Sequence, residues 1–432
     1  MKNILRSALE AVDAGKALRR AVRKRGPVLM IGGRRYDLRR YGRIVVVGAG
    51  KATASMARAM EPMLGPRLEQ GLVIVKYGHA LPTRRIAVKE AGHPLPDRAG
   101  LRAAALVREM AGSSSARDLL IVLLSGGASS LMPAPVPGVS LEEKQRITQQ
   151  LLRSGADIEE INLVRKHLSL LKGGRLAQFT QATIVTLILS DVLGDDLSAI
   201  ASGPTAPDPT TFRQAVNCLK RYGLWSTAPA GVRAHLDRGK RGLVPETPKS
   251  GASLFRRVHN CIIGRSADAV AAAAQAARQA GLNTVIHPTM LTGEARLAGA
   301  AFAGIARRIV KKARAARRPC CIIAPGETTV TVKGSGRGGR AQEFAVAAAE
   351  AIAGLDGVSI VAVGTDGTDG PTDVAGAVVD GRTMRRAGRL GIDLERALRE
   401  NDTYPALSRL SAHIRTGPTN TNVNDLYLLL VL

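Results

Sequence analysis

The sequence predicts a two-domain α/β protein, with a mainly parallel sheet in the first domain and a mixed sheet in the second. Three observations support this fold class. The 432 residues suffice for two ordinary domains, each with its own apolar core. Apolar strand-like runs alternate with helical patterns, which is typical of βαβ units. A stretch rich in glycine, proline and charge at 238–252 indicates a connecting segment, so we expect domains over 1–237 and 253–432.

The first half begins with a basic amphipathic segment and continues with buried strands. Apolar residues recur at near-helical spacing over 1–25, so we expect a helix that packs on a domain core rather than on a membrane surface. The runs RIVVV (43–47), LLIVLL (119–124) and TIVTLIL (183–189) are almost continuously apolar. Strands of a parallel sheet that is covered on both faces have this pattern. The apolar runs fall well short of the roughly 20 residues that a membrane helix needs.

The second half contains a further series of strand-like runs separated by helical patterns such as SADAVAAAAQAARQA. The runs are CIIG (261–264), TVI (284–286), CCIIA (320–324), TTVTV (328–332) and VSIVAVG (358–364). Because TTVTV alternates β-branched residues, it predicts a strand of an antiparallel or mixed sheet.

The formal net charge of +27 is the one unusual global property. Clustered cations would favour nucleic-acid binding, since they neutralise phosphates. The basic residues are instead spread over many segments, and aromatic residues make up only 3% of the chain, which leaves few for base stacking. We therefore expect a basic surface that attracts anionic small molecules, and neither a nucleic-acid nor a membrane partner. The N-terminus lacks the apolar block of a signal peptide, so we expect a cytoplasmic protein.

Glycine-rich turns directly after apolar strands are the most informative feature, because ligands of open α/β sheets bind outside the carboxyl ends of the strands. The first turn, GAGK, places Gly48, Gly50 and Lys51 between a strand and a helix. It departs from a dinucleotide fingerprint at Thr53 and also from a Walker P-loop. Three interpretations stay open: a purely structural turn, a turn that presents one lysine to a negative group, and the start of an NAD(P)-dependent oxidoreductase.

The second turn, LLSGGASS, supplies Ser125, Gly126, Gly127 and Ser129. Small residues let the backbone close on a ligand, and the hydroxyls are additional hydrogen-bond donors. The turn lacks the G-x-S-x-G pattern of a hydrolase nucleophile. We therefore expect a cradle for phosphate or carboxylate rather than a nucleophilic serine.

Carboxylates follow apolar strands in three further loops. Asp191, Asp195 and Asp196 follow TIVTLIL, Glu327 follows CCIIA, and Asp366 follows VSIVAVG. Carboxylates at strand ends can hold Mg²⁺ or accept a hydroxyl proton, although two of the first three could simply cap the next helix.

Two polar loops complete the set. GSGRGGR presents Arg337 and Arg340, whose guanidinium groups can bind phosphoryl oxygens in a bidentate manner, and a flexible basic hairpin is the plainer alternative. The loop before the last apolar run contains Thr416, Asn420, Asn422, Asn424 and Asp425.

Taken in order, eight motifs resemble the glycerate 2-kinase family with a C-terminal MOFRL domain, from about Gly48 to Leu426. They are GAGKA, LLSGGAS, VRKHLSLLKGGRLA, SDVLGDDLSAIASGPTAPDPTT, LTGEAR, GETTVTVKGSGRGGRAQE, GTDGTDGPTDVAGA and TGPTNTNVNDL. The resemblance implies an N-terminal Rossmann-like domain, a C-terminal MOFRL α/β domain and an active-site cleft between them. It implies ATP, Mg²⁺ and D-glycerate as ligands and 2-phosphoglycerate as product. Two positions depart from the family pattern: Ala341 replaces the usual Asn, and Asn420 replaces a usual Gly.

The resemblance also assigns roles. The GAGK lysine of the family corresponds to Lys51 and its GGR arginine to Arg340, and we expect both cations to hold phosphates. Asp191 is the candidate that orients or deprotonates the attacking hydroxyl. Glu327 and Asp366 could hold the metal or its waters, and Asn422 would hydrogen-bond the substrate or the nucleotide. The division of roles among the carboxylates stays open, and so does oligomeric state, with a homodimer as one option.

Overall fold

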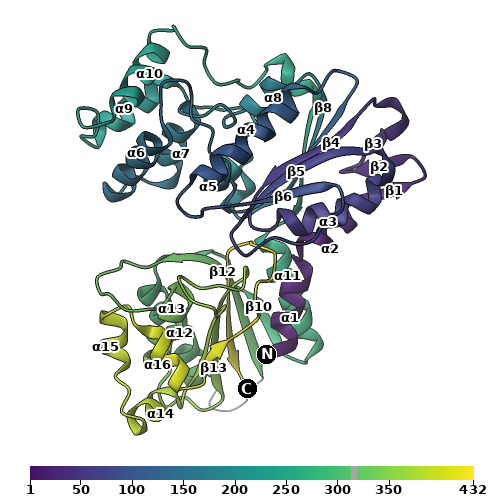
Figure 1. Cartoon of the computed structure of the whole chain (residues 1–432). Coiled ribbons are helices and arrows are strands. Elements are labelled where there is room, and N and C mark those ends of the chain that lie inside the picture. The colour runs from purple at the N-terminus through teal and green to yellow at the C-terminus, as the bar shows by residue number, and fades with distance from the viewer. Residues whose placement is uncertain (313–318) are drawn as a thin grey trace. The chain divides into compact units, whose positions relative to one another are not determined.

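The computed structural model describes residues 1–312 and 319–432, and these residues form two compact units (Figure 1). The parallel-sheet unit comprises Ala14–Gly264. The mixed-sheet unit is made of two pieces of chain, Met1–Asp13 and Arg265–Leu432. The chain therefore passes from one unit to the other twice.

The boundary between the units lies at Gly264 and Arg265, beyond the expected connection at 238–252. That segment belongs to the parallel-sheet unit and is tied to it by its own side chains. The Glu246 carboxylate accepts a hydrogen bond from the Phe212 backbone N–H at 2.7 Å, and the Thr247 hydroxyl donates to Asp208 at 2.9 Å. Its glycine and proline content therefore reflects irregular backbone on a packed unit and not a linker.

The parallel-sheet unit is built on a six-stranded, all-parallel sheet in the order β6-β5-β4-β7-β8-β9. The chain builds outward from β4 in one direction and from β7 in the other. Helices α3 and α4 pack against the sheet, so β4 and β7 are buried along their whole length, as their apolar sequences predict. The strands are β4 (Ile44–Ala49), β5 (Leu68–Lys76), β6 (Ile86–Ala91), β7 (Leu119–Leu124), β8 (Thr183–Leu189) and β9 (Val258–Gly264).

Helices complete this unit in two groups. Those close to the sheet are α2 (Ala14–Ala21), α3 (Thr53–Leu64), α4 (Arg98–Gly112), α5 (Ala128–Leu131) and α8 (Arg175–Phe179). A separate apolar cluster around Phe212 joins α6 (Leu141–Arg153), α7 (Ile158–His167), α9 (Phe212–Arg221) and α10 (Ala230–Lys240). A small antiparallel sheet of β1 (Val22–Arg25), β2 (Val28–Ile31) and β3 (Arg34–Asp37) was not predicted, because its strands are short and the outer two, β1 and β3, are rich in arginine.

The mixed-sheet unit has the strand order β10-β12-β16-β13-β14-β15, with β11 also paired to β12. β10 and β11 run parallel to β12, and the remaining pairs are antiparallel. This confirms the mixed sheet. Its strands are β10 (Asn283–Ile286), β11 (Leu291–Glu294), β12 (Cys320–Thr329), β13 (Val358–Gly364), β14 (Gly376–Asp380), β15 (His413–Ile414) and β16 (Asp425–Val431).

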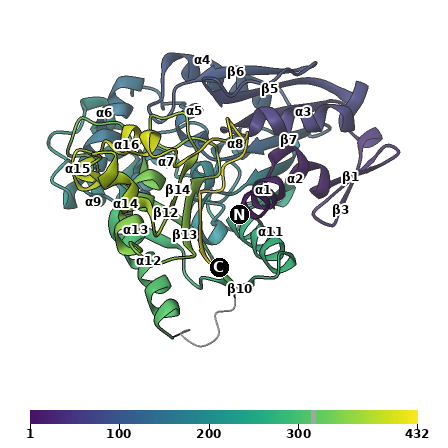
Figure 2. The same cartoon turned by 90° about the horizontal axis from the view of Figure 1, so that it is seen from below.

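The first helix of the chain packs within the mixed-sheet unit. Figure 2 shows α1 (Lys2–Ala11) beside α11 (Ser266–Gln279), and α1 buries Ile4, Leu5 and Ala8. The other helices of the unit are α12 (Ala295–Lys312), α13 (Arg340–Ala351), α14 (Thr383–Arg389), α15 (Leu394–Arg399) and α16 (Thr403–Arg409). The expected amphipathic segment 1–25 is thus divided between the two units.

Two expected strands differ from the structure. The predicted strand TTVTV at 328–332 is absent as a separate element, because β12 continues through Pro325 and Gly326 and ends at Thr329. CIIG at 261–264 forms the end of β9 and pairs with β8, so it belongs to the parallel sheet and not to the second half. In the described part of the chain, no helix is both long and apolar enough to cross a membrane.

Candidate active site

The turn after β4 requires glycine at two positions. A Cβ on Gly48 would lie 2.3 Å from the Leu123 carbonyl oxygen, because β7 runs directly alongside. Gly50 has a φ of +142°, and a Cβ there would lie 2.1 Å from the Ser125 hydroxyl oxygen. The two glycines therefore let the turn that ends in Lys51 press against the turn that follows β7.

Hydrogen bonds hold these two turns together. The Lys51 backbone N–H donates to the Gly126 carbonyl at 2.9 Å, and the Ala52 N–H donates to the Ser125 hydroxyl at 3.0 Å. Ser125 is 1% exposed, so its hydroxyl supports the backbone and is not an accessible nucleophile. Gly127, in the left-handed conformation at φ +86°, leaves room for His93 and the side chain of Lys51. The backbone of Lys51 is thereby fixed between two adjacent strand ends.

These turns lie where the strand order of the sheet reverses direction. β4 and β7 are neighbours, yet the chain leaves them toward opposite edges of the sheet. In open α/β sheets, ligands bind outside the carboxyl ends of the strands at such a reversal. Gly48, Gly50, Lys51 and Ser125 are thus at the position where this architecture places a ligand.

Ser129, at the start of α5, leads into a chain of polar side chains. Its hydroxyl lies 2.8 Å from the Ser202 hydroxyl, which donates to the Asn162 carbonyl oxygen at 3.0 Å. Ser202 and its neighbour Ala201 both have positive φ, at +59° and +55°. Non-glycine residues in this conformation are strained and concentrate at functional sites. Neither Ser202 nor Asn162 was predicted as a site residue, although Ser202 lies within the motif SDVLGDDLSAIASGPTAPDPTT.

Asp191 lies at the same edge of the sheet, two positions beyond the end of β8. The preceding backbone N–H, of Ser190, donates to the Gly264 carbonyl at 2.8 Å and so fixes the exit of the strand. Asp196 accepts hydrogen bonds from the Ser198 backbone N–H at 2.8 Å and from its hydroxyl at 2.9 Å. Asp196 therefore stabilises the local turn, whereas Asp191 remains the catalytic candidate.

In the mixed-sheet unit, Arg340 is the first residue of α13 and pairs with two carboxylates. Its Nε lies 2.8 Å from Asp425 Oδ2, its Nη2 donates to Asp425 Oδ1 at 2.9 Å, and its Nη1 lies 3.3 Å from Glu327. Glu327 is on β12, and Asp425 begins the adjacent β16 opposite Gly326. The sheet register thus brings together two carboxylates that are far apart in the sequence.

Asp425 is buried and its partner Arg340 is half-buried, and burial changes the electrostatics of both groups. Asp425 is 2% exposed and accepts a further hydrogen bond from the Tyr427 hydroxyl at 3.1 Å. Burial raises the pKa of Asp425 to about 7, against the opposing attraction of Arg340. The pKa of Arg340 is lowered by burial but raised overall by Asp425 and Glu327. Asp425 was noted in the sequence only as part of a polar loop, because the strand register that joins it to Arg340 is not visible there.

Asp369 fixes the start of the helix that carries Arg340. It accepts hydrogen bonds from the backbone N–H of Ala341 at 3.0 Å and of Gln342 at 2.9 Å, and from the Gln342 side chain at 3.0 Å. Free N–H groups at a helix start need such acceptors. Ala341, the departure from the family pattern, is fully buried and makes this contact through its backbone. The substitution therefore preserves the hydrogen bond to Asp369.

Asp366 and Asn422 lie on neighbouring loops. One Asp366 carboxylate oxygen accepts from the Thr368 N–H and hydroxyl, both at 3.1 Å, and the Asp366 carbonyl accepts from the Thr419 N–H at 3.3 Å. Asn422 is partly buried in the loop that contains Thr419. Asn420 has a φ of +54°, so asparagine occupies a left-handed position where the family usually has glycine.

The described residues contain no group of three His, Cys, Asp or Glu side chains arranged to hold a metal ion. Glu327 is paired with Arg340, and one oxygen of Asp366 is used in its own turn. These residues do not form a protein cage for a cation. The assignment of Asp366 and Glu327 to a metal remains a prediction.

Models of two families match the chain. Residues 1–237 match the model described as "Domain of unknown function (DUF4147)", and residues 320–425 match the MOFRL family. A relative from Thermotoga maritima named D-glycerate 2-kinase is 44% identical, over 90% of this chain and 91% of its own length. The chain belongs to the glycerate 2-kinase family. The motif resemblance and the fold class it implied are therefore confirmed.

A solved glycerate kinase structure has the same fold. The crystal structure of glycerate kinase from Thermotoga maritima matches with a TM-score of 0.84 at 41% identity, covering 99% of this chain and 98% of that one. A relative from Agrobacterium vitis has a different name, putative hydroxypyruvate reductase, at 42% identity over 90% of this chain and 87% of its own length. The names of these relatives thus include both enzyme classes that were considered from the sequence, a kinase and an oxidoreductase.

Proposed function

We propose that this chain transfers the γ-phosphoryl group of ATP to the 2-hydroxyl of D-glycerate, giving 2-phosphoglycerate and ADP. The observation that carries the proposal is the turn at Lys51. Its backbone is fixed between two strand ends where the sheet order reverses, so that a cation is presented where α/β sheets bind ligands. Family membership then identifies the reaction among those that need such a cation.

The charged and amide side chains among the predicted site residues have separate roles in this reaction. The 2-hydroxyl oxygen attacks the γ-phosphorus, the bond from that phosphorus to the β–γ bridging oxygen breaks, and ADP leaves. Asp191 orients the hydroxyl and accepts its proton. Lys51 and Arg340 stabilise the phosphoryl oxygens, since phosphoryl transfer depends mainly on positioning and charge stabilisation. Asn422 hydrogen-bonds the substrate or the nucleotide.

We also propose that Mg²⁺ arrives with ATP. Magnesium sites in kinases commonly combine substrate phosphates with one or two carboxylates and retain several waters. Glu327 and Asp366 are the candidate carboxylates for this role, and the ion would neutralise charge on the phosphates. A protein cage of three ligands is not required. We place the activity in the cytoplasm, where ATP is supplied.

The product's regiochemistry tests the proposal. Purified protein with ATP, Mg²⁺ and D-glycerate should form 2-phosphoglycerate, which enolase dehydrates directly, as followed by absorbance of phosphoenolpyruvate. A requirement for added phosphoglycerate mutase would identify the 3-phosphate and contradict the assignment.

The oxidoreductase alternative needs its own assay, because a relative is named putative hydroxypyruvate reductase. The turn at Gly48 and Gly50 departs from the dinucleotide fingerprint at Thr53, where the third glycine would allow close packing of helix and strand. We expect no consumption of NADH or NADPH with hydroxypyruvate, monitored at 340 nm. Turnover of either cofactor without kinase activity would favour the reductase.

A further inference from the structure

The parallel-sheet unit contains a group of buried or half-buried basic side chains outside the residues assigned above. They are Lys144, Arg165, Lys166, Lys172 and Arg175, most of them in or beside the VRKHLSLLKGGR motif. Buried cations normally have partners, because an unpaired buried charge is costly. It is therefore informative to ask which of these cations has a partner.

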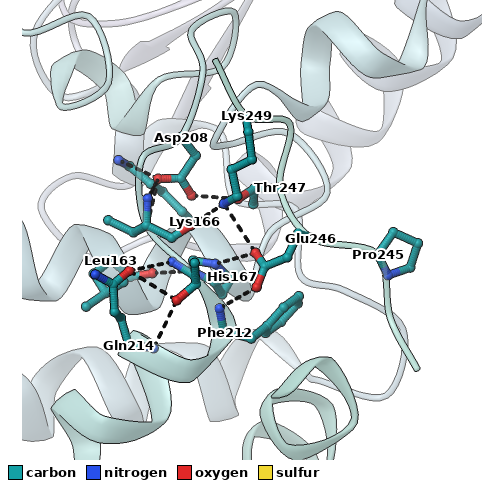
Figure 3. A network of polar contacts seen from close by, with 12 residues as sticks. Leu163, Lys166, His167, Asp208, Phe212, Gln214, Pro245, Glu246, Thr247 and Lys249 are labelled. Carbon is teal, nitrogen blue, oxygen red and sulfur yellow. Dashed lines mark hydrogen bonds and ion pairs between the residues drawn. The ribbon is translucent and has the colours of Figure 1, made fainter. Parts of the chain in front are cut away.

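Several neighbours in this region are paired. Figure 3 shows Lys166 against Asp208, with 3.3 Å between Nζ and Oδ1, and His167 against Glu246, with 3.3 Å between Nε2 and Oε2. The ammonium group of Lys144 donates to the Leu168 carbonyl at 2.9 Å. Lys166, His167 and Lys144 thus each have a structural partner.

Lys172 is different. Its side chain is fully buried, and its ammonium nitrogen has no hydrogen-bond partner among residues 1–312 and 319–432. Burial and, to a smaller extent, the charge of the nearby Arg165 together lower the pKa of Lys172 to about 7. No structural pairing explains a lysine at this position. A protein that retains such a charge loses stability, which is expected where the charge has a function.

The backbone connects Lys172 to the polar chain at the ligand edge of the sheet. The N–H of Gly173, the next residue, donates to the Ser202 carbonyl at 2.9 Å, and the Gly174 N–H donates to the Gly203 carbonyl at 2.7 Å. The hydroxyl of Ser202 contacts both Ser129 and Asn162. Arg165 lies three positions after Asn162 on α7. The backbone thus joins the segment of Lys172 to the segment of Ser202, and α7 carries both Asn162 and Arg165, whose charge acts on Lys172.

We propose that this arrangement is the binding subsite for the carboxylate of the acceptor. The polar chain Ser129–Ser202–Asn162 makes the contacts, and Lys172 and Arg165 supply the compensating positive charge. The inference rests on the proposed function for the identity of the acceptor, a 2-hydroxycarboxylate. Fixing the carboxylate also fixes which hydroxyl, the one on the adjacent carbon, faces the transferable phosphoryl group. Lys172 is a positioning residue in this arrangement, whereas Lys51 and Arg340 act on the phosphates.

The substitution Lys172→Met tests the subsite, because methionine is similar in shape and uncharged. We expect the KM for D-glycerate to rise about 10- to 100-fold, as for loss of a charge-assisted interaction, with the KM for ATP unchanged. The variant should also melt at a higher temperature, since a buried unpaired charge has been removed. A purely structural role for Lys172 predicts a lower melting temperature and equal effects on both substrates, and would overturn the proposal.

Lys144→Met is the matched control. It removes an ammonium group from the same buried region, but this group already donates a hydrogen bond to the Leu168 carbonyl. We expect this variant to lose stability and to keep its KM for D-glycerate within about threefold of the wild type, which is the opposite pattern to Lys172→Met. An equal rise in KM for both variants would show a general loss of positive charge and would contradict a localised subsite.

Direct binding separates this inference from the proposed reaction. Calorimetric titration of D-glycerate into the full chain without nucleotide should give heat with the wild type and much less with Lys172→Met, and glycerol should give none with either. If the wild type binds D-glycerate in this manner but forms no 2-phosphoglycerate, the subsite stands and the kinase assignment fails. Equal binding of D-glycerate by wild type and variant refutes the subsite, whatever the activity.

Discussion

At the scale of single residues, Arg340 is held by geometry that lysine cannot reproduce. Its guanidinium group contacts both oxygens of Asp425 and also reaches Glu327. Arg340→Lys keeps the charge but loses the bidentate contact, so turnover should fall about 10²–10³-fold. Lys51→Ala should have a similar effect. Steady-state kinetics will measure the fall in turnover, at a temperature where circular dichroism shows that both variants are folded.

Arg337 is the control for Arg340 in the same loop. It is exposed and stacks on the Tyr404 ring, with 4.4 Å from the guanidinium carbon to the ring centroid. The loop is therefore anchored by Tyr404 and is not the flexible basic hairpin considered from the sequence. Arg337→Lys should retain most of the turnover. Near-wild-type activity of both Arg340→Lys and Lys51→Ala would refute the phosphate-binding roles.

Lys172 gives a pH-dependent contribution to stability. The pKa of Lys172 is about 7 in the folded chain, against 10.5 for an ordinary lysine. Between these values the unfolded state binds more protons at this position, so the free energy of unfolding should rise with pH, and the penalty is greatest below pH 7. The charged groups close to Lys172 are Arg165 and Lys144. Arg175 lies close to Lys144, with Asp208 and Glu246 near Arg175.

Urea unfolding between pH 7 and 10 will test this pH dependence. The stability difference between Lys172→Met and wild type should shrink as pH rises, because the wild-type lysine becomes neutral in both states. A difference that stays constant over this range would show that the ammonium is compensated in the folded chain.

At the scale of secondary-structure elements, the start of α13 links stability to the site. Asp369→Ala removes the acceptor for two backbone N–H groups and one side chain, and should cost about 2 kcal/mol of unfolding free energy. Because Arg340 is the first residue of this helix, kcat should fall as well. Urea unfolding and initial-rate kinetics measure the two effects. Asp369→Asn retains one acceptor oxygen, so its unfolding free energy and its kcat should lie between those of the wild type and those of Asp369→Ala. An unchanged kcat in Asp369→Ala would show that the helix cap does not affect catalysis.

The elements also show what the sequence could predict. Continuous apolar runs predicted β4, β7 and β8, because burial on both faces leaves a strong pattern. The sheet formed by β1, β2 and β3 was missed, because arginines occupy most of its exposed positions and its strands have only four residues each. Glycine turns in the sequence pointed to Lys51 and Arg340 as candidates. Asp425 and Ser202 needed the strand register and the backbone conformation, which only the fold supplies.

At the scale of the whole molecule, α1 stabilises the mixed-sheet unit, whose other residues, Arg265–Leu432, lie far from it in the sequence. Ile4 is 2% exposed and belongs to the face packed on α11. Ile4→Ala should destabilise the mixed-sheet unit by roughly 2–4 kcal/mol, whereas Arg6→Ala, on the exposed face, should have almost no effect. The loop with Asn422 should also exchange faster, because the Thr421 hydroxyl donates to the Val12 carbonyl.

Two probes distinguish the units in this experiment. Trp225, the single tryptophan, lies in the parallel-sheet unit, so its fluorescence transition should not move in Ile4→Ala. Hydrogen exchange along β16 should become faster. If the tryptophan transition shifted and exchange in β16 did not change, α1 would contribute to the stability of the parallel-sheet unit instead.

The two crossings of the chain between units also affect how the protein is made. A ribosome delivers α1 first and its packing partner α11 only after all of Ala14–Gly264 has been synthesised. At about 5–20 residues per second, that interval is on the order of 10–50 s. The parallel-sheet unit can be complete by then, while Ile4 and Leu5 still expose their side chains to water. During translation, the nascent chain therefore exposes the apolar side chains of this amphipathic segment, where a chaperone or another nascent chain can reach them.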